Sequence, residues 1–244
     1  MDAQTFLRMR QIEDEHWWFS ARRRIVSEVI ASLALPPQPR ILDAGCGTGG
    51  ILPALAAFGP VIGVEADEEA VELARGRNVG TVYRGSLPDD MPAECANSDL
   101  VVLADVLEHI EEEDRSLAAV RRLMNPGGYV LLTVPAWPFL WGRYDVKHHH
   151  KRRYVAETLR ATVERSGLVL THMTYYNTVL FPLMAAVRLA DRMWPRSYDT
   201  DDLAIPPRPL NRMLEGLFAS ERHVVPRVRL PFGVSLLAVA RNPQ

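Results

Sequence analysis

The stretch Arg40-Ile-Leu-Asp-Ala-Gly-Cys-Gly-Thr-Gly-Gly50 decides the class of fold. An apolar run ends directly in glycines, and Gly45, Gly47 and Gly50 satisfy the G-x-G-x-x-G pattern of a strand that turns into a helix beneath a bound dinucleotide. A second apolar run ends at Glu65, 20 residues after Gly45, where a carboxylate would accept hydrogen bonds from ribose hydroxyls. The two features together predict a site for a cofactor that contains adenosine.

Asp43, two residues before the first of these glycines, separates the candidate cofactors. In an NAD site the pyrophosphate would lie at this loop, and its repulsion from a partly buried carboxylate would cost on the order of 1 kcal/mol or more. S-adenosylmethionine (SAM) has no phosphate, and its sulfonium and ammonium groups are compatible with a nearby carboxylate. The acid therefore favours SAM over NAD. An NAD-dependent oxidoreductase, and a purely structural role for Asp43 as a cap of the next helix, stay open as alternatives.

Four segments in succession resemble the class I SAM-dependent methyltransferases: Ile41 to Gly49, Gly63 to Asp67, Asp99 to His109, and Leu123 to Tyr129. Ahead of them, His16-Trp-Trp-Phe19 followed by Arg22-Arg23 is similar to a bacterial, methyltransferase-11/23-like subgroup whose N-terminal helix covers the SAM site. The resemblance implies an enzyme that transfers methyl groups, with SAM as cofactor and S-adenosyl-L-homocysteine as product. A SAM-binding protein without catalysis, used as a sensor or partner subunit, is the alternative from another class.

The resemblance also implies the cofactor contacts. The glycine loop would line the methionine end of SAM, Glu65 would bind the ribose, and the residues after the second, third and fourth strands would flank the adenine and the sulfonium. Many members have an Asp after the third strand, where this chain has Gly85-Ser-Leu87. In the N-terminal helix one tryptophan would close over the cofactor and one arginine would pair with its carboxylate. The expected cofactor-binding residues are Asp43, Gly45, Cys46, Gly47, Gly49, Glu65, Ala66, Ser86, Leu87, Ala104, Asp105, Trp18 and Arg23.

Strand and helix patterns alternate from Arg40 to Tyr176, which predicts a parallel sheet covered on both faces. Together with the resemblance, the expected fold class is α/β: a Rossmann-like, seven-stranded, mostly parallel sheet with helices on both faces, the last strand antiparallel, plus a helical cap. The expected units are an N-terminal helical cover (1–39), a SAM-binding core (40–176 and 233–244), and an insert (177–232) that forms a substrate cap or a dimer contact. The expected strands are 40–44, 61–65, 79–83, 100–103, 129–134, 168–176 and 234–240, and the expected core helices are 51–58, 68–75, 115–124 and 155–166.

The reacting side of the site is expected at the carboxyl edge of the sheet, where open α/β sheets bind ligands. Methyl transfer is an in-line displacement, so the main task is to align the nucleophile, the methyl carbon and the sulfur. The expected catalytic residues, which follow the fourth and fifth strands, are His109, Tyr144, His148, His149 and His150. Their structural alternatives are a packed turn for His109 and a solvated basic loop for the histidine tract. No further histidine or cysteine is assigned beside the tract, so no metal is expected.

The composition narrows the acceptor and the setting. The chain has 244 residues and a net charge of -2, so no basic excess is available to neutralise nucleic acid. Two cysteines, and the lack of an apolar run of roughly 20 residues, predict a cytoplasmic protein without a transmembrane segment. The apolar stretch from Val179 to Ala190 leaves peripheral membrane contact and a homodimer open. The expected acceptor is a small molecule, methylated on an oxygen of a natural product, a saccharide or a lipid-linked metabolite.

Overall fold

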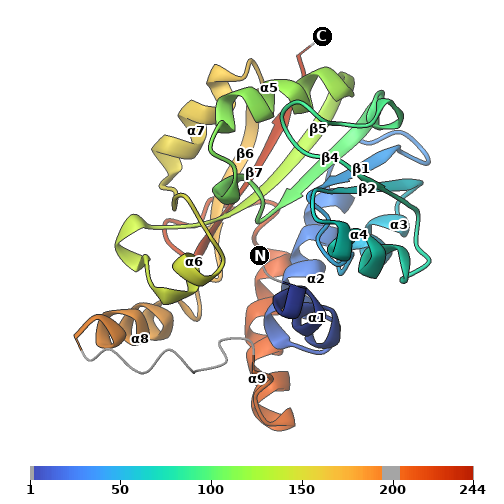
Figure 1. Cartoon of the computed structure of the whole chain (residues 1–244). Coiled ribbons are helices and arrows are strands. Elements are labelled where there is room, and N and C mark those ends of the chain that lie inside the picture. The colour runs from blue at the N-terminus through green and yellow to red at the C-terminus, as the bar shows by residue number, and fades with distance from the viewer. Residues whose placement is uncertain (1–2, 194–203, 244) are drawn as a thin grey trace.

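The computed structural model describes residues 3–193 and 204–243, and a seven-stranded sheet organises them (Figure 1). The strand order is β3-β2-β1-β4-β5-β7-β6. Neighbouring strands are parallel except at β7, which runs antiparallel to both β5 and β6. This confirms the expected Rossmann-like α/β class with an antiparallel last strand. The strands are β1 (Ile41–Ala44), β2 (Val61–Glu65), β3 (Thr81–Arg84), β4 (Ser98–Ala104), β5 (Met124–Pro135), β6 (Val169–Tyr176) and β7 (Ser235–Arg241).

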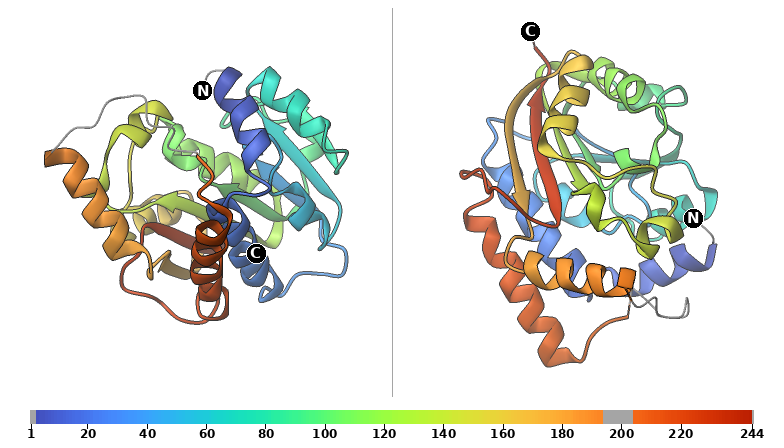
Figure 2. Two further views of the ribbon diagram at one scale, coloured as in Figure 1. Left: turned by 90° about the horizontal axis from the view of Figure 1, so that it is seen from below. Right: turned by 90° about the vertical axis from the view of Figure 1, so that its left-hand side faces the viewer.

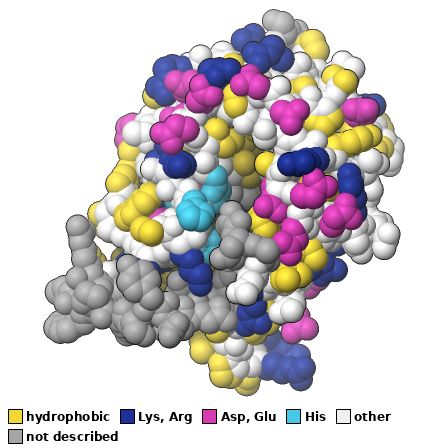
Figure 3. Space-filling model, in the orientation of Figure 1, with side chains coloured by type: hydrophobic (Ala, Val, Ile, Leu, Met, Phe, Trp, Pro, Cys, Tyr) yellow, Lys and Arg dark blue, Asp and Glu magenta, His cyan; other side chains and the backbone are white. Residues whose placement is uncertain are grey.

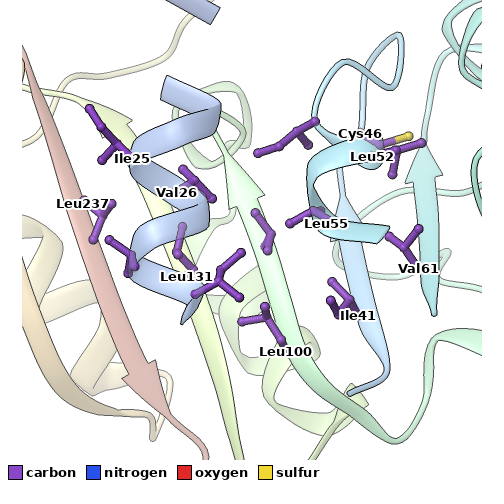
Figure 4. Packing of buried hydrophobic residues seen from close by; sticks show 14 of the residues in the cluster. Ile25, Val26, Ile41, Cys46, Leu52, Leu55, Val61, Leu100, Leu131 and Leu237 are labelled. Carbon is purple, nitrogen blue, oxygen red and sulfur yellow. The ribbon is translucent and has the colours of Figure 1, made fainter. Parts of the chain in front are cut away.

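Helices cover both faces of this sheet, as expected. On one face, α2 (Trp17–Ala31), α3 (Leu52–Ala56) and α4 (Glu68–Arg75) share a buried apolar cluster with the strands. Figure 4 shows Ile25 and Val26 of α2 beside Leu131 and Leu237 of the sheet. On the other face, α5 (Glu113–Leu123) and α7 (Ala156–Arg165) complete a second cluster. Because apolar side chains leave each strand in both directions, the central strands are buried on both faces.

The largest difference from the expected elements lies at the start of β5. The sequence predicted that Asn125-Pro-Gly-Gly128 would separate a helix from a strand beginning at Tyr129. In the structure β5 already begins at Met124, which pairs with Ser98, and the next pair joins Leu100 to Tyr129, so residues 125–128 form an irregularity on β5. The turn signal is therefore kept as a break in the register inside β5, where Gly127 has a φ of +78°. Helix α3 is also shorter than expected, because it covers only Leu52–Ala56.

Two groups of helices lie outside the alternating core. The first is α1 (Ala3–Ile12), which contacts α4, and α2. The second lies between β6 and β7 and comprises α8 (Phe181–Met193), α9 (Arg208–Ala219) and η4 (Ser220–His223). Helix α9 packs along α2, so the two groups meet at one end of the molecule (Figure 2). Residues 194–203 of the predicted insert lie outside the described part of the chain.

A buried carboxylate anchors the second group to the sheet. Glu221 in η4 accepts hydrogen bonds from the backbone N–H groups of Asn177, Thr178 and Val179, at 2.7–2.9 Å. These donors follow the end of β6, so one side chain fixes the direction in which the chain leaves the sheet. Across residues 3–193 and 204–243, we find no helix that is long and apolar enough to span a bilayer.

Candidate active site

One cavity of about 1020 Å³ lies at the carboxyl ends of β1, β2 and β4. Its wall includes all five expected catalytic residues and all the expected cofactor-binding residues except Gly49. Gly49 instead packs beneath the loop, where a Cβ would lie 2.9 Å from Arg77 Cδ and 3.2 Å from the backbone of Ala74. Residues separated by more than 100 positions in the sequence therefore meet in one space, as the topology of a parallel sheet requires.

The glycine loop and Glu65 form one hydrogen-bonded unit at the floor of this cavity. Glu65 Oε2 accepts a hydrogen bond from the Gly47 N–H at 2.9 Å, and Oε1 accepts from the N–H of Ala66 at 2.8 Å. Gly45 has a φ of +85°, and a Cβ there would lie 2.7 Å from a methyl group of Val106. Only glycine fits this turn, because an added side chain would be strained and would collide with the start of the next loop.

Asp43 is the most unusual group in the cavity wall. It is 1% exposed, and neither carboxylate oxygen has a hydrogen-bond partner among the residues that the structure describes. Burial raises its pKa to about 7, opposed by the positive charge of Arg22 and assisted by the negative charge of Glu65. A buried carboxyl group without a partner is costly, so this position suits a ligand that brings positive charge. The ammonium and sulfonium of SAM meet that requirement.

The N-terminal helix α2 contributes aromatic and basic groups above the loop. The guanidinium of Arg22 forms a short ion pair with Asp105 and lies 4.6 Å from the centre of the Trp18 ring. The expected Arg23 also lines the cavity, but its guanidinium donates to the backbone carbonyl of Glu13 at 2.6 Å. The sequence analysis predicted Arg23 and not Arg22, although both belong to the run Arg22-Arg23-Arg24. Arg22 is the one that reaches the strand ends.

A second polar contact holds α1 and its following turn against the glycine loop. Glu13 is buried, accepts a hydrogen bond from the Thr48 hydroxyl at 2.6 Å, and forms a short ion pair with Arg77. Gly50 leaves room for this carboxylate, because a Cβ there would lie 2.0 Å from Glu13 Oε2. This contact was not predictable from the sequence, because its members are more than 30 positions apart.

Two of the predicted histidines meet in the wall of the cavity. The rings of His109, at the end of η2 (Leu107–His109), and His150 are edge to face with centroids 4.7 Å apart. His150 Nδ1 lies 2.9 Å from Asp145 Oδ1, and Arg153 donates to the same oxygen at 2.8 Å. Burial alone would raise the pKa of Asp145, but these two partners lower it to about 2. A fixed carboxylate behind the ring leaves Nε2 of His150 as its free nitrogen. Histidine side chains form one visible patch on this face (Figure 3).

The remaining predicted catalytic residues occupy different surroundings. His148 is buried against Tyr144, with ring centroids 4.1 Å apart, whereas His149 is exposed. Burial, followed by the charge of His150, lowers the pKa of both His109 and His148 to about 4, so both rings are neutral at pH 7. Burial also raises the pKa of the Tyr144 hydroxyl.

Glu108 is a site residue that the sequence analysis did not select. It is fully buried and lines the cavity, and within the described ranges its carboxylate oxygens have no hydrogen-bond partner. Burial and the charge of Asp105 raise its pKa well above the usual value. The signal was present in the quoted segment Asp105-Val-Leu-Glu-His109, but a glutamate in a short turn after a strand is ordinarily solvated.

The sheet order, the glycine loop and the cavity define the class of protein: a Rossmann-like, SAM-dependent methyltransferase domain. A family described as "Methyltransferase domain" matches residues 18–173, and the chain belongs to this family. Its cofactor is therefore SAM.

Curated relatives agree with this assignment. A "Probable S-adenosylmethionine-dependent methyltransferase" of Mycolicibacterium smegmatis is 29% identical over 159 residues, which cover 64% of this chain and 61% of that protein. A "Ubiquinone biosynthesis O-methyltransferase" of Sinorhizobium fredii is 26% identical over 160 residues, or 57% of this chain and 64% of that protein. The chain thus spans less than two thirds of the length of these relatives.

A solved structure shows the same fold. It is the phosphoethanolamine N-methyltransferase 2 of Haemonchus contortus, in complex with S-adenosyl-L-methionine. It superposes with a TM-score of 0.58 at 18% identity, covering 90% of this chain and 52% of that one.

Proposed function

We propose that the protein transfers the methyl group of SAM to an oxygen atom of a small-molecule acceptor. The supporting observation is that one cavity holds two chemically distinct ends. At one end the unpartnered Asp43 and the loop-bound Glu65 suit the cofactor. At the other end the paired His109 and His150 face the space that remains for an acceptor.

Oxygen is the acceptor atom that most needs such a cluster. In the transfer, the acceptor oxygen attacks the methyl carbon, the carbon–sulfur bond breaks, and its electron pair stays on sulfur as S-adenosylhomocysteine forms. A hydroxyl must also lose its proton, whereas a neutral amine can attack directly. Asp145 holds Nδ1 of the His150 ring. We propose that Nε2 of the same ring accepts the proton of the acceptor hydroxyl. The Sinorhizobium relative is a ubiquinone biosynthesis O-methyltransferase, which favours the same acceptor atom.

We further propose that the two helical groups outside the core enclose the two ligands. All five residues line the cavity: in this proposal Trp18 and Arg22 of α2 cover the cofactor, and Met184, Val187 and Arg188 of α8 cover the acceptor. Arg188 contacts the face of Tyr144, with its guanidinium 5.8 Å from the ring centre. Met184 and Val187 offer an apolar surface beside the histidines, so an acceptor with an apolar body fits it better than a free saccharide.

The test follows label from methyl-tritiated SAM into a panel of phenols, aliphatic alcohols, carboxylic acids and amines. We expect label in an ether or an ester, identified by mass spectrometry and by its stability to base. His150→Ala should lower the rate at least about a hundredfold with SAM affinity within about twofold of wild type. Label found only in amines would contradict oxygen transfer. SAM binding with no transfer to any class would favour the non-catalytic alternative.

A further inference from the structure

Three potential ligand groups converge at the acceptor end of the cavity. Glu108, His109 and His150 each place one oxygen or nitrogen so that all three atoms lie within 4.8 Å of one another. Two ligand atoms on one transition-metal ion, at about 2.1 Å each, are at most about 4.2 Å apart. A side-chain adjustment of under about 1 Å would therefore let all three reach a common ion. The groups come from two loops, because His150 follows α6 (Arg143–Lys147) whereas the other two lie in η2.

Neighbouring groups orient both imidazoles toward this point. Asp145 occupies Nδ1 of His150, so Nε2 is the nitrogen that faces the cluster. The backbone of His148 hydrogen-bonds the His109 ring, which leaves the other nitrogen of His109 for a second partner. Histidines that bind metals ordinarily have their second nitrogen held by a carboxylate or a backbone carbonyl in this way. Each ring here has one of these two supports.

The surroundings of Glu108 independently indicate that a cation binds at this cluster. Its carboxylate is completely buried, and neither oxygen finds a donor within the described part of the chain. A buried carboxylate needs a hydrogen bond or a positive charge. Among the described residues no ion pair joins it to a cation, although the charges of Arg22 and Arg153 act on it and two imidazoles lie beside it. A bound divalent ion would complete its coordination and offset its charge.

We propose that Glu108, His109 and His150 bind one divalent transition-metal ion. Two imidazoles and one carboxylate suit zinc, manganese, iron or cobalt rather than calcium or magnesium. Three protein ligands leave at least one coordination position open to the cavity. The role of this metal ion rests on the proposed function. An acceptor hydroxyl in the open coordination position would lose its proton to solvent more readily. In the loaded protein, Nε2 of His150 is then a ligand and not the proton acceptor.

The test measures binding of the metal alone, without turnover. The full-length chain is dialysed against a chelator and then titrated with Zn²⁺ and, separately, with Mn²⁺ by calorimetry. We expect one site per chain, absent from Glu108→Gln and His150→Ala. Asp145→Asn, which loosens the His150 ring, should weaken binding by about ten- to a hundredfold. His149→Ala is the matched control, because it removes an exposed histidine directly beside His150 and should bind metal like wild type.

Three results would overturn the inference: no binding by the wild-type chain, binding that survives in both Glu108→Gln and His150→Ala, or loss of binding in His149→Ala. SAM affinity of each variant verifies its fold, and Glu108→Gln carries the test alone if His150→Ala does not fold. The acceptor assay is separate from this titration. A metal-free protein that still makes an O-methyl product would therefore reject only the metal's role in the transfer, and would keep the proposed function.

Discussion

The Glu65 carboxylate accepts a hydrogen bond from the Gly47 N–H, at 2.9 Å from Oε2. This contact joins the end of β2 to the glycine loop after β1, so the residue expected to bind the ribose also holds the loop that lines the rest of the cofactor. The end of the sheet is thereby organised before any ligand arrives.

The first prediction concerns this carboxylate. Glu65→Ala removes the acceptor for two ribose hydroxyls and loosens Gly47, so SAM affinity should fall by about 3 kcal/mol, a hundredfold or more. Calorimetric titration with SAM measures the change. Glu68→Gln is the control, since Glu68 is exposed on α4 and its ion pair with Arg84 lies at the surface. Wild-type affinity in Glu65→Ala would refute the placement of the ribose.

The second prediction is a pH dependence that originates at Asp43. Its pKa of about 7 in the free protein means that half of the molecules carry a neutral Asp43 at that pH. SAM favours the ionised form, so its affinity should rise by about tenfold between pH 5.5 and 7.0. Asp43→Asn should bind weakly at both pH values. A wild-type affinity that does not change with pH would contradict the account.

The pKa of Asp43 also predicts how the free energy of unfolding of the free protein changes with pH. The folded pKa of about 7 lies above the usual 3.8, so the stabilising contribution is complete below pH 3.8 and is lost as the pH rises toward 7. Arg22 and Glu65 are the charged groups that act on it. Urea unfolding of wild type and Asp43→Asn at pH 5 and 8 measures the difference. The variant should gain stability relative to wild type at the higher pH.

The third prediction separates two arginines of one helix. Arg22→Ala leaves a largely buried Asp105 without its cation and should cost about 3–5 kcal/mol of unfolding free energy. Arg24→Ala removes a half-exposed partner of Glu215 and should cost about 0–1 kcal/mol. Equal losses in chemical denaturation would show that the Arg22 pair is not a structural link between α2 and the strand ends.

The fourth prediction tests how α1 and its following turn are held on the glycine loop. Gly50→Ala places a methyl group where Glu13 Oε2 now lies, so the turn and α1 should be displaced. Hydrogen exchange of residues 3–16 should become faster, and SAM affinity should fall. Gly216→Ala is the control, because the space around this exposed glycine of α9 is open and the change should stabilise the helix by about 0.5–1 kcal/mol. Unchanged exchange in Gly50→Ala would contradict the contact.

The local sequence pattern was sufficient to predict the part of the site that the glycine loop and its neighbouring strand form. The glycines, Asp43 and Glu65 lie at the ends of two adjacent parallel strands, so their spacing in the sequence predicted their meeting. The His109 and His150 contact was not predictable in its geometry, because each residue follows a different strand and the intervening loop sets the approach. Asp145 was missed for the same reason, since its partners are set by the turn that contains α6.

Pairs between distant elements were beyond the reach of sequence reasoning. Arg22 and Asp105 are 83 positions apart, and the run of three arginines gave no reason to select one of them. Glu108 lies in the segment Asp99 to His109, but the sequence does not reveal that it is buried and has no hydrogen-bond partner among the described residues. The Pro-Gly-Gly segment before Tyr129 predicted that the strand starts after it, whereas the pairing of Met124 with Ser98 extends β5 across the segment and leaves it as an irregularity.

The most direct measurement is a crystal structure of the protein with S-adenosylhomocysteine. The account predicts the ligand's ammonium within hydrogen-bonding distance of Asp43, its ribose hydroxyls on Glu65, and its sulfur directed toward the space beside His109 and His150. A ligand bound elsewhere, or one whose sulfur points away from the two histidines, would contradict it.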